Sequence, residues 1–173
     1  MNQLNHFLFS IACTILFLNR LNVESFLVII AFTYLVNDFI SFFHERYRRE
    51  EKPWYHKRTW IEEIPGLILI GMPIAYLLSF INAKFFWFVL IPYLTHILCD
   101  YLCIFEATPF DPFIKWKKKE GWGIFIPDDL IWKSENSVRW AQRVKVKKLK
   151  GISENYFTPF AILFLLFSIL TRI

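Results

Sequence analysis

Glycine, cysteine and the signatures of several common enzyme classes are scarce in this chain. It contains five glycines and three cysteines in 173 residues. A glycine-rich phosphate loop, a G-x-S-x-G elbow and an H-E-x-x-H pair are all absent from the sequence, which excludes the nucleotide-binding, serine-hydrolase and metalloprotease classes that depend on them. The three cysteines lie within apolar runs, so we expect packing residues or free thiols there and no disulfide framework.

Basic residues are absent ahead of the first apolar run. The chain begins MNQLN, and no small-x-small cleavage site follows the run. A cleaved signal peptide has both features, so we interpret the run as part of the mature protein.

Apolar side chains, in contrast, are abundant, at 55% of the sequence with 20% aromatic residues. The long apolar runs are His6 to Leu18, Phe26 to Phe43, Ile64 to Ile81, Phe85 to Phe105 and Tyr156 to Leu170. A transmembrane helix needs roughly 20 apolar residues, and the first run is the shortest. We therefore predict an all-α, polytopic helical membrane protein with four or five transmembrane segments, in which residues 1–173 form a single integral membrane domain.

The basic residues are concentrated in two loops. Of the twenty lysines and arginines, six lie between His44 and Glu63 and eleven between Glu106 and Asn155. Basic loops stay on the cytoplasmic side. This predicts a multi-pass protein of the cell membrane, with the amino terminus and loops 44–63 and 106–155 in the cytoplasm and the carboxyl terminus outside.

The loop at 106–155 is the one sizeable extramembrane segment, and it alternates aromatic with basic residues. Tryptophan favours the headgroup level and lysine binds anionic phosphates, so we expect this loop to lie on the membrane surface. Its expected partners are membrane lipids with anionic headgroups. A protein or nucleic-acid partner is the alternative, although no nucleic-acid-binding module is present.

Several ionisable residues are expected to lie at one membrane level. His6 opens the first run, Asp38 and His44 end the second, Glu62 and Glu63 begin the third, and His96 and Asp100 lie toward the end of the fourth. Because consecutive spans run in opposite directions, all of these positions fall at the cytoplasmic side.

This set has the chemistry of a metal site. His96 and Asp100 are four residues apart and therefore share a helix face. A carboxylate in lipid is costly unless it is paired or binds a cation, and imidazole with carboxylate is a common ligand set for zinc, manganese or iron. We predict a divalent metal site formed by His6, Asp38, Glu62, His96 and Asp100. The alternative is a hydrogen-bonded His–Asp pair that only holds helices together.

Four motifs in this order resemble the YdjM-type family of LexA-binding, inner-membrane-associated proteins regarded as metal-dependent hydrolases, and in particular its archaeal relatives. They are LNHFLFS with His6, VNDFIS with Asp38, a basic arginine-containing loop, and LTHILCDYLCIFEATPFDPF with His96 and Asp100. The resemblance covers roughly residues 1–113. It implies a helical membrane protein with a metal-dependent hydrolytic site.

Two positions depart from the family pattern. Ile40 stands where a second aspartate often follows Asp38, and Glu62 stands in place of the histidine of a Thr-His-Ser triplet. Glutamate also binds hard or borderline cations, so Glu62 either keeps a site with a changed metal preference or marks a member that has lost its chemistry. His56 is expected to be a solvated loop residue. His44 is either a partner of Asp38 or a residue that interacts with the helix dipole.

The function that we predict is a membrane-embedded, metal-dependent hydrolase with a His/Asp/Glu site at the cytoplasmic face. The metal activates a water molecule, and Glu62 or Asp100 is the expected catalytic carboxylate. A non-catalytic membrane protein, whose basic loop binds lipid or a protein or nucleic-acid partner, is the alternative.

Basic residues beside this site suit a lipid or another substrate with an anionic headgroup, because guanidinium and ammonium groups form charge-assisted hydrogen bonds with phosphate. The candidate substrate-binding residues are Arg46, Arg49, Lys57 and Arg58. Anchoring the topology is the alternative role for each of them.

Overall fold

The computed structural model describes residues 3–48, 60–102, 125–126 and 152–173. Nearly all of them are helical. The helices are α1 (Gln3–Leu16), α2 (Val23–Arg48), α3 (Ile64–Gly66), α4 (Met72–Ser79), α5 (Ala83–Leu102) and α8 (Phe157–Leu170). Single turns of 3-10 helix lie at Trp60–Glu62 and Glu154–Tyr156, and two-residue strands β1 (Phe125–Ile126) and β2 (Ile152–Ser153) pair in parallel. The predicted all-α class is confirmed.

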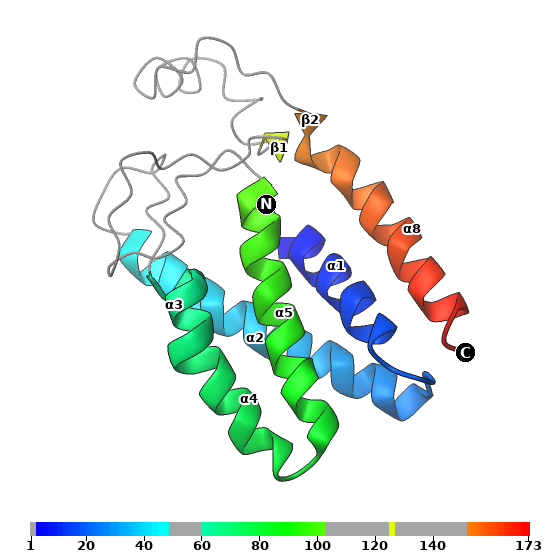
Figure 1. Cartoon of the computed structure of the whole chain (residues 1–173). Coiled ribbons are helices and arrows are strands. Elements are labelled where there is room, and N and C mark those ends of the chain that lie inside the picture. Colours follow the sequence, from blue (N-terminus) through cyan, green and yellow to red (C-terminus); the bar gives the residue numbers. More distant parts are fainter. Residues whose placement is uncertain (1–2, 49–59, 103–124, 127–151) are drawn as a thin grey trace.

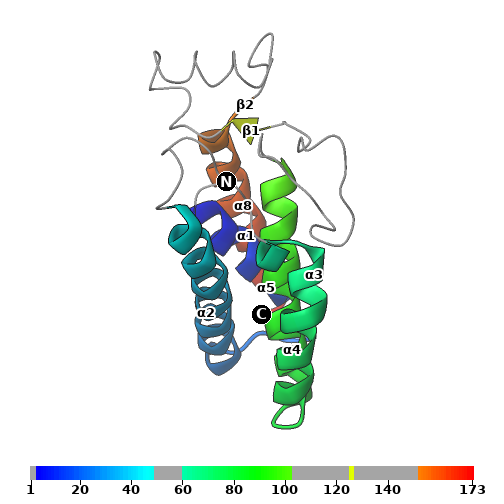
Figure 2. The same cartoon turned by 90° about the vertical axis from the view of Figure 1, so that its left-hand side faces the viewer.

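Helix α5 lies at the centre of the bundle, where it packs against α1, α2 and α4, while α8 packs on α1. In Figure 1 the first turn of α1, the last turn of α5 and the start of α8 lie at one end of the bundle. The turns that join α1 to α2 and α4 to α5 lie at the opposite end, and Figure 2 shows the same arrangement from the side. This alternation brings sequence-distant helix ends to one level.

The first two helices form a hairpin, joined by a short turn that contains Asn19, Arg20 and Asn22. The Ser25 amide donates to Asn22 Oδ1 at 2.7 Å, so Asn22 satisfies one backbone donor at the start of α2. The carboxyl-terminal residues close over this turn, because Arg172 Nη2 donates to the Leu16 carbonyl at 2.8 Å and the Leu21 amide donates to the Arg172 carbonyl at 2.7 Å. The chain end is therefore fixed beside the α1–α2 turn.

Two helical segments are long and apolar enough to cross a membrane: Val23–Phe42 within α2, and α5. Three apolar helical segments are shorter, namely Gln3–Leu16, Ile64–Ser79 and Phe157–Leu170. A helix of 14 residues, such as α1 or α8, is only about 21 Å long, against a hydrocarbon core of about 30 Å. All five predicted apolar segments are thus helical, and the number of them that cross the membrane stays a prediction.

The third apolar segment is not a uniform α-helix. Between α3 and α4, one π-helical turn runs from Leu67 to Gly71, and the Met72 amide donates to the Leu67 carbonyl, five residues back. Pro73 follows and has no N–H to continue the α-helical pattern, which accounts for the wider turn at this position. The π turn packs against Tyr93 of α5.

Candidate metal centre

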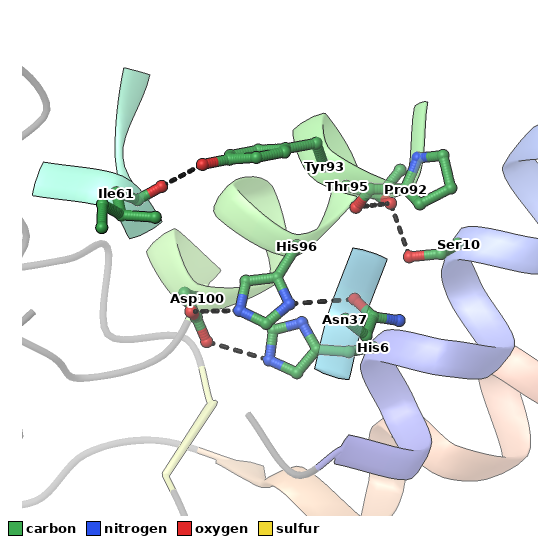
Figure 3. A network of polar contacts seen from close by, with 9 residues as sticks. All are labelled: His6, Ser10, Asn37, Ile61, Pro92, Tyr93, Thr95, His96 and Asp100. Atoms are coloured by element: carbon green, nitrogen blue, oxygen red, sulfur yellow. Dashed lines mark hydrogen bonds and ion pairs between the residues drawn. The ribbon is translucent and has the colours of Figure 1, made fainter. Parts of the chain in front are cut away.

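Two histidines and one aspartate meet at the end of the bundle where α1 begins and α5 ends (Figure 3). His6 Nε2 lies 2.9 Å from Asp100 Oδ1, and His96 Nε2 lies 3.4 Å from Asp100 Oδ2. All three residues are buried, with 3%, 7% and 8% of their surface exposed for His6, His96 and Asp100. Their ligand atoms lie within 4.8 Å of one another.

Helix geometry explains this convergence. The four-residue spacing places His96 and Asp100 one above the other on the same face of α5. His6 lies in the first turn of α1, which packs along α5 so that the His6 ring stacks on the His96 ring, with centroids 4.1 Å apart and planes inclined by 21°. The hydroxyl of Ser10, one turn after His6 on α1, is hydrogen-bonded at 2.6 Å to the hydroxyl of Thr95, the residue before His96, and this contact fixes the packing.

Helix α2 contributes an amide to the same cluster. Asn37 Oδ1 lies 3.0 Å from His96 Nδ1, on the side of the ring that faces away from Asp100 (Figure 3). Asn37 belongs to a buried stripe of α2 that also contains Ile29, Thr33 and Ile40, at spacings of four, four and three residues. The amide is therefore placed by the face with which α2 packs on the bundle.

Two further carboxylates are buried immediately before α3. Glu62 and Glu63 are 1% and 0% exposed. The Tyr101 hydroxyl donates to Glu63 Oε2 at 2.9 Å, and the Tyr93 hydroxyl donates to the Ile61 carbonyl. Both tyrosines belong to the part of α5 that carries His96 and Asp100, so these contacts hold the Glu62–Glu63 turn beside the His–Asp cluster.

The structure brings three of the five predicted ligands together and places the other two elsewhere. The structure brings together His6, His96 and Asp100. Glu62 is buried at the same end of α5, in electrostatic contact with Tyr93, and is outside the three-residue group. Asp38 is exposed on α2, because it lies about 100° around the helix from Asn37 and therefore off the buried stripe.

The other predicted residues fall largely outside the described part. His44 and Arg46 belong to the last turns of α2, whose side chains are not described there. Arg49, His56, Lys57, Arg58 and most of loop 106–155 lie outside the described residues.

Asn37 was missed by sequence reasoning, whereas Glu63 was expected at the same membrane level as Glu62 but was not among the predicted ligands. Asn37 is neutral and stands next to Asp38, so composition alone favours the aspartate. The spacing of Ile29, Thr33, Asn37 and Ile40 along α2 is the signal that identifies Asn37 as inward-facing.

The donor set fits a divalent cation. Two imidazole nitrogens and one carboxylate are a recurrent combination for zinc and for non-haem iron. An amide oxygen on the far nitrogen of a histidine ring is a typical outer-shell contact of a metal-bound histidine. Burial of Asp100, Glu62 and Glu63 at one end of the bundle adds a concentration of negative charge that favours a cation.

Fold and site together define an apolar helical bundle with a buried His–His–Asp cluster at one end. The model of the YdjM inner membrane protein family matches residues 1–172, so the chain belongs to this family. The resemblance inferred from residues 1–113 is confirmed and extends over nearly the whole chain, and membrane localisation follows from it. Comparisons with curated proteins and with solved structures found no match.

Proposed function

We propose that this protein is a membrane-embedded, metal-dependent hydrolase whose centre is formed by His6, His96 and Asp100. The observation that carries the proposal is the convergence of these three buried side chains from two helices, with their ligand atoms within 4.8 Å of one another. Packing alone does not require two imidazoles and a carboxylate to face one another in an apolar bundle.

Each residue has a role that follows from its contacts. His6 and His96 would bind the metal through Nε2, the atoms that face Asp100, and Asp100 would bind it through its carboxylate. A bound divalent metal lowers the pKa of water, so that water becomes a nucleophile near neutral pH.

Glu62 is the proposed general base. Its side chain is 1% exposed and lies at the end of α5 that carries the His–Asp cluster. A buried carboxylate beside the reacting water is suited to accept its proton. Asp38, the other predicted ligand, is exposed on α2 and has no role in this proposal.

The proposed substrate is a lipid or another molecule with an anionic headgroup. The cluster lies at the end of the bundle to which the basic segments 49–59 and 103–124 connect. Arg46, Arg49, Lys57 and Arg58 would bind the headgroup. By the distribution of basic residues, this end faces the cytoplasm.

Metal content is the direct test of this function. We expect near-stoichiometric metal, measured by mass spectrometry, in the detergent-purified wild-type protein. His96→Gln and Asp100→Asn should lose most of it, because each removes one ligand while preserving side-chain size. A wild-type protein that is folded yet binds no metal after supplementation with zinc, manganese or iron would overturn the proposal.

Ser10→Ala is the matched control. It removes an interhelical hydrogen bond between the same two helices, at a position one turn after His6, and leaves the ligands intact. We expect it to retain the metal. A loss equal to that of His96→Gln would mean that helix packing, and not ligation, controls the metal content.

A non-catalytic role in helix assembly is the second candidate. Polar contacts join helices elsewhere in this bundle, as Ser10 does with Thr95 and as the Thr158 hydroxyl does in donating to Asn5 Oδ1 at 2.8 Å. The His–Asp cluster would then be one more such contact. The same metal measurement separates the two candidates.

A further inference from the structure

Asn37 contacts Nδ1 of His96. In a neutral ring, the protonation of this atom decides whether Nε2, which faces Asp100, carries a proton. The amide oxygen lies 3.0 Å from Nδ1, while Nε2 faces the Asp100 carboxylate at 3.4 Å. The two nitrogens of the ring thus face two different acceptors, Asn37 from α2 and Asp100 on the same helix as the histidine (Figure 3).

The position of the ring proton follows from these contacts. An amide oxygen only accepts hydrogen bonds, so Nδ1 must carry a proton when it faces Asn37 Oδ1. A neutral imidazole has one such proton. With a cation bound, the lone pair of Nε2 would be free to bind that cation beside Asp100 and His6, which is the state that a metal ligand requires.

We propose that Asn37 is a positioning residue, which holds the His96 proton on Nδ1 and keeps Nε2 available as a ligand. The inference rests on the proposed function and adds to it a residue that acts through His96. It also gives a reason for burying this amide, which is 9% exposed, on the packed face of α2.

The rest of the Asn37 side chain supports this role. Its Nδ2 atom is buried and has no hydrogen-bond partner within the described part of the chain. Burial of an amide nitrogen without a partner is unfavourable, so the amide is not placed there to secure the helix packing. Its contribution within the described residues is the contact with His96.

Thr33 is the matched control that the chain itself provides. It lies one helical turn before Asn37 on the same buried stripe, it is fully buried, and its hydroxyl also has no hydrogen-bond partner in the described regions. Thr33→Val therefore changes a buried polar group of α2 without touching His96.

The first test is the protonation of the His96 ring, read from 15N-imidazole NMR spectra of the metal-free protein at neutral pH, with the signals assigned through His96→Gln. We expect a protonated Nδ1 in the wild type, in Thr33→Val and in Asn37→Asp, which keeps an oxygen acceptor. In Asn37→Leu we expect the proton to move to Nε2, where Asp100 accepts it. An unprotonated Nδ1 in the wild type, or a protonated Nδ1 that persists in Asn37→Leu, would overturn the inference.

The second test is metal affinity, measured by competition with a chelator. Loss of an outer-shell partner typically weakens binding about 10- to 100-fold, which we expect for Asn37→Leu. Thr33→Val and Asn37→Asp should stay close to the wild type. Equal losses of affinity in Thr33→Val and Asn37→Leu would refute a specific role of Asn37. If Asn37→Leu does not fold, Asn37→Asp still tests the inference, because Nδ1 of His96 must keep its proton in that variant.

The two proposals fail in different ways. A wild-type protein that binds no metal but shows the Asn37-dependent proton on Nδ1 would overturn the hydrolase function and support the action of Asn37 on His96. If the protein binds stoichiometric metal and Asn37→Leu does not weaken this binding, the hydrolase function is supported and the positioning role of Asn37 is refuted.

Discussion

At the scale of single residues, the Glu63–Tyr101 contact shows how the protein accommodates a carboxylate in an apolar bundle. Glu63 is fully buried, and the Tyr101 hydroxyl donates to it at 2.9 Å. A hydrogen bond to a charged group in such surroundings is stronger than one in water. Tyr101 directly follows Asp100, so the same bond fixes the last turn of α5.

Replacing this tyrosine should destabilise the protein. Tyr101→Phe removes the hydroxyl that donates to a buried carboxylate, and we expect it to lower the free energy of unfolding by about 1–3 kcal/mol. Thermal unfolding in detergent, followed by circular dichroism, measures the effect. Tyr34→Phe, at an exposed position of α2, is the control and should be neutral; equal unfolding midpoints for both variants would refute the importance of the bond.

The sequence predicts part of this cluster for a definite reason. His96 and Asp100 share a helix face by spacing alone, and His6 joins them because alternating spans return to the same level. Asn37 was not predicted, since its identity carries no charge and its orientation depends on which face of α2 packs inward. The choice between Asp38 and Asn37 is decided by tertiary packing, which a motif does not contain.

At the scale of elements, the segment from Trp60 to Ser79 depends on glycine at two close approaches. A Cβ atom at Gly66 would lie 2.1 Å from the Ile61 carbonyl oxygen, and one at Gly71 would lie 3.0 Å from the Tyr93 ring. The first contact is with backbone and the second with a side chain. The Ile61 carbonyl also accepts the hydrogen bond from Tyr93, so the glycine at 66 allows the Glu62–Glu63 turn to dock on α5.

Alanine at these two positions should therefore have unequal effects. Gly66→Ala forces the Ile61 backbone away, and we expect this to lower the free energy of unfolding by about 1–3 kcal/mol or more. This loss exceeds the roughly 1 kcal/mol that alanine contributes as a better helix former than glycine. Gly71→Ala should be close to neutral, because the gain in helix propensity offsets a small shift of the Tyr93 ring. Unfolding midpoints in detergent compare the two, and a Gly66→Ala variant as stable as Gly71→Ala would contradict this explanation.

The elements themselves were predictable where apolar length determines them. Each of the five apolar runs contains a helix, because a backbone in an apolar environment must satisfy its own hydrogen bonds. The π turn between α3 and α4 was not predicted, since it depends on Pro73 together with the packing of Tyr93. The first run is also shifted from α1, which begins before the run, at Gln3, and stops at Leu16.

At the scale of the whole molecule, the two ends of the bundle differ in chemistry. One end contains the buried acids and histidines, and the other contains the two short turns. This asymmetry, with the basic segments attached to the first end, is the basis for the predicted orientation.

Cysteine labelling tests that orientation. In a cysteine-free background, we expect Asn82→Cys, in the exposed turn before α5, to react with a membrane-impermeant maleimide in intact cells. Arg58→Cys, in the basic loop, should react only after permeabilisation. The reverse pattern would place the His–Asp cluster on the outer side of the membrane and refute the predicted topology.

The packing of α1 on α8 has a consequence for biosynthesis. His6 is synthesised well before α8, on which α1 lies, and before Arg172, which binds the Leu16 carbonyl. A nascent chain therefore carries His6 through the synthesis of α2 and α5 before α1 acquires α8 as its neighbour. Packing of the helix that carries His6 is thereby coupled to the synthesis of α8, so we expect a chain interrupted before α8 to hold His6 less firmly in the centre.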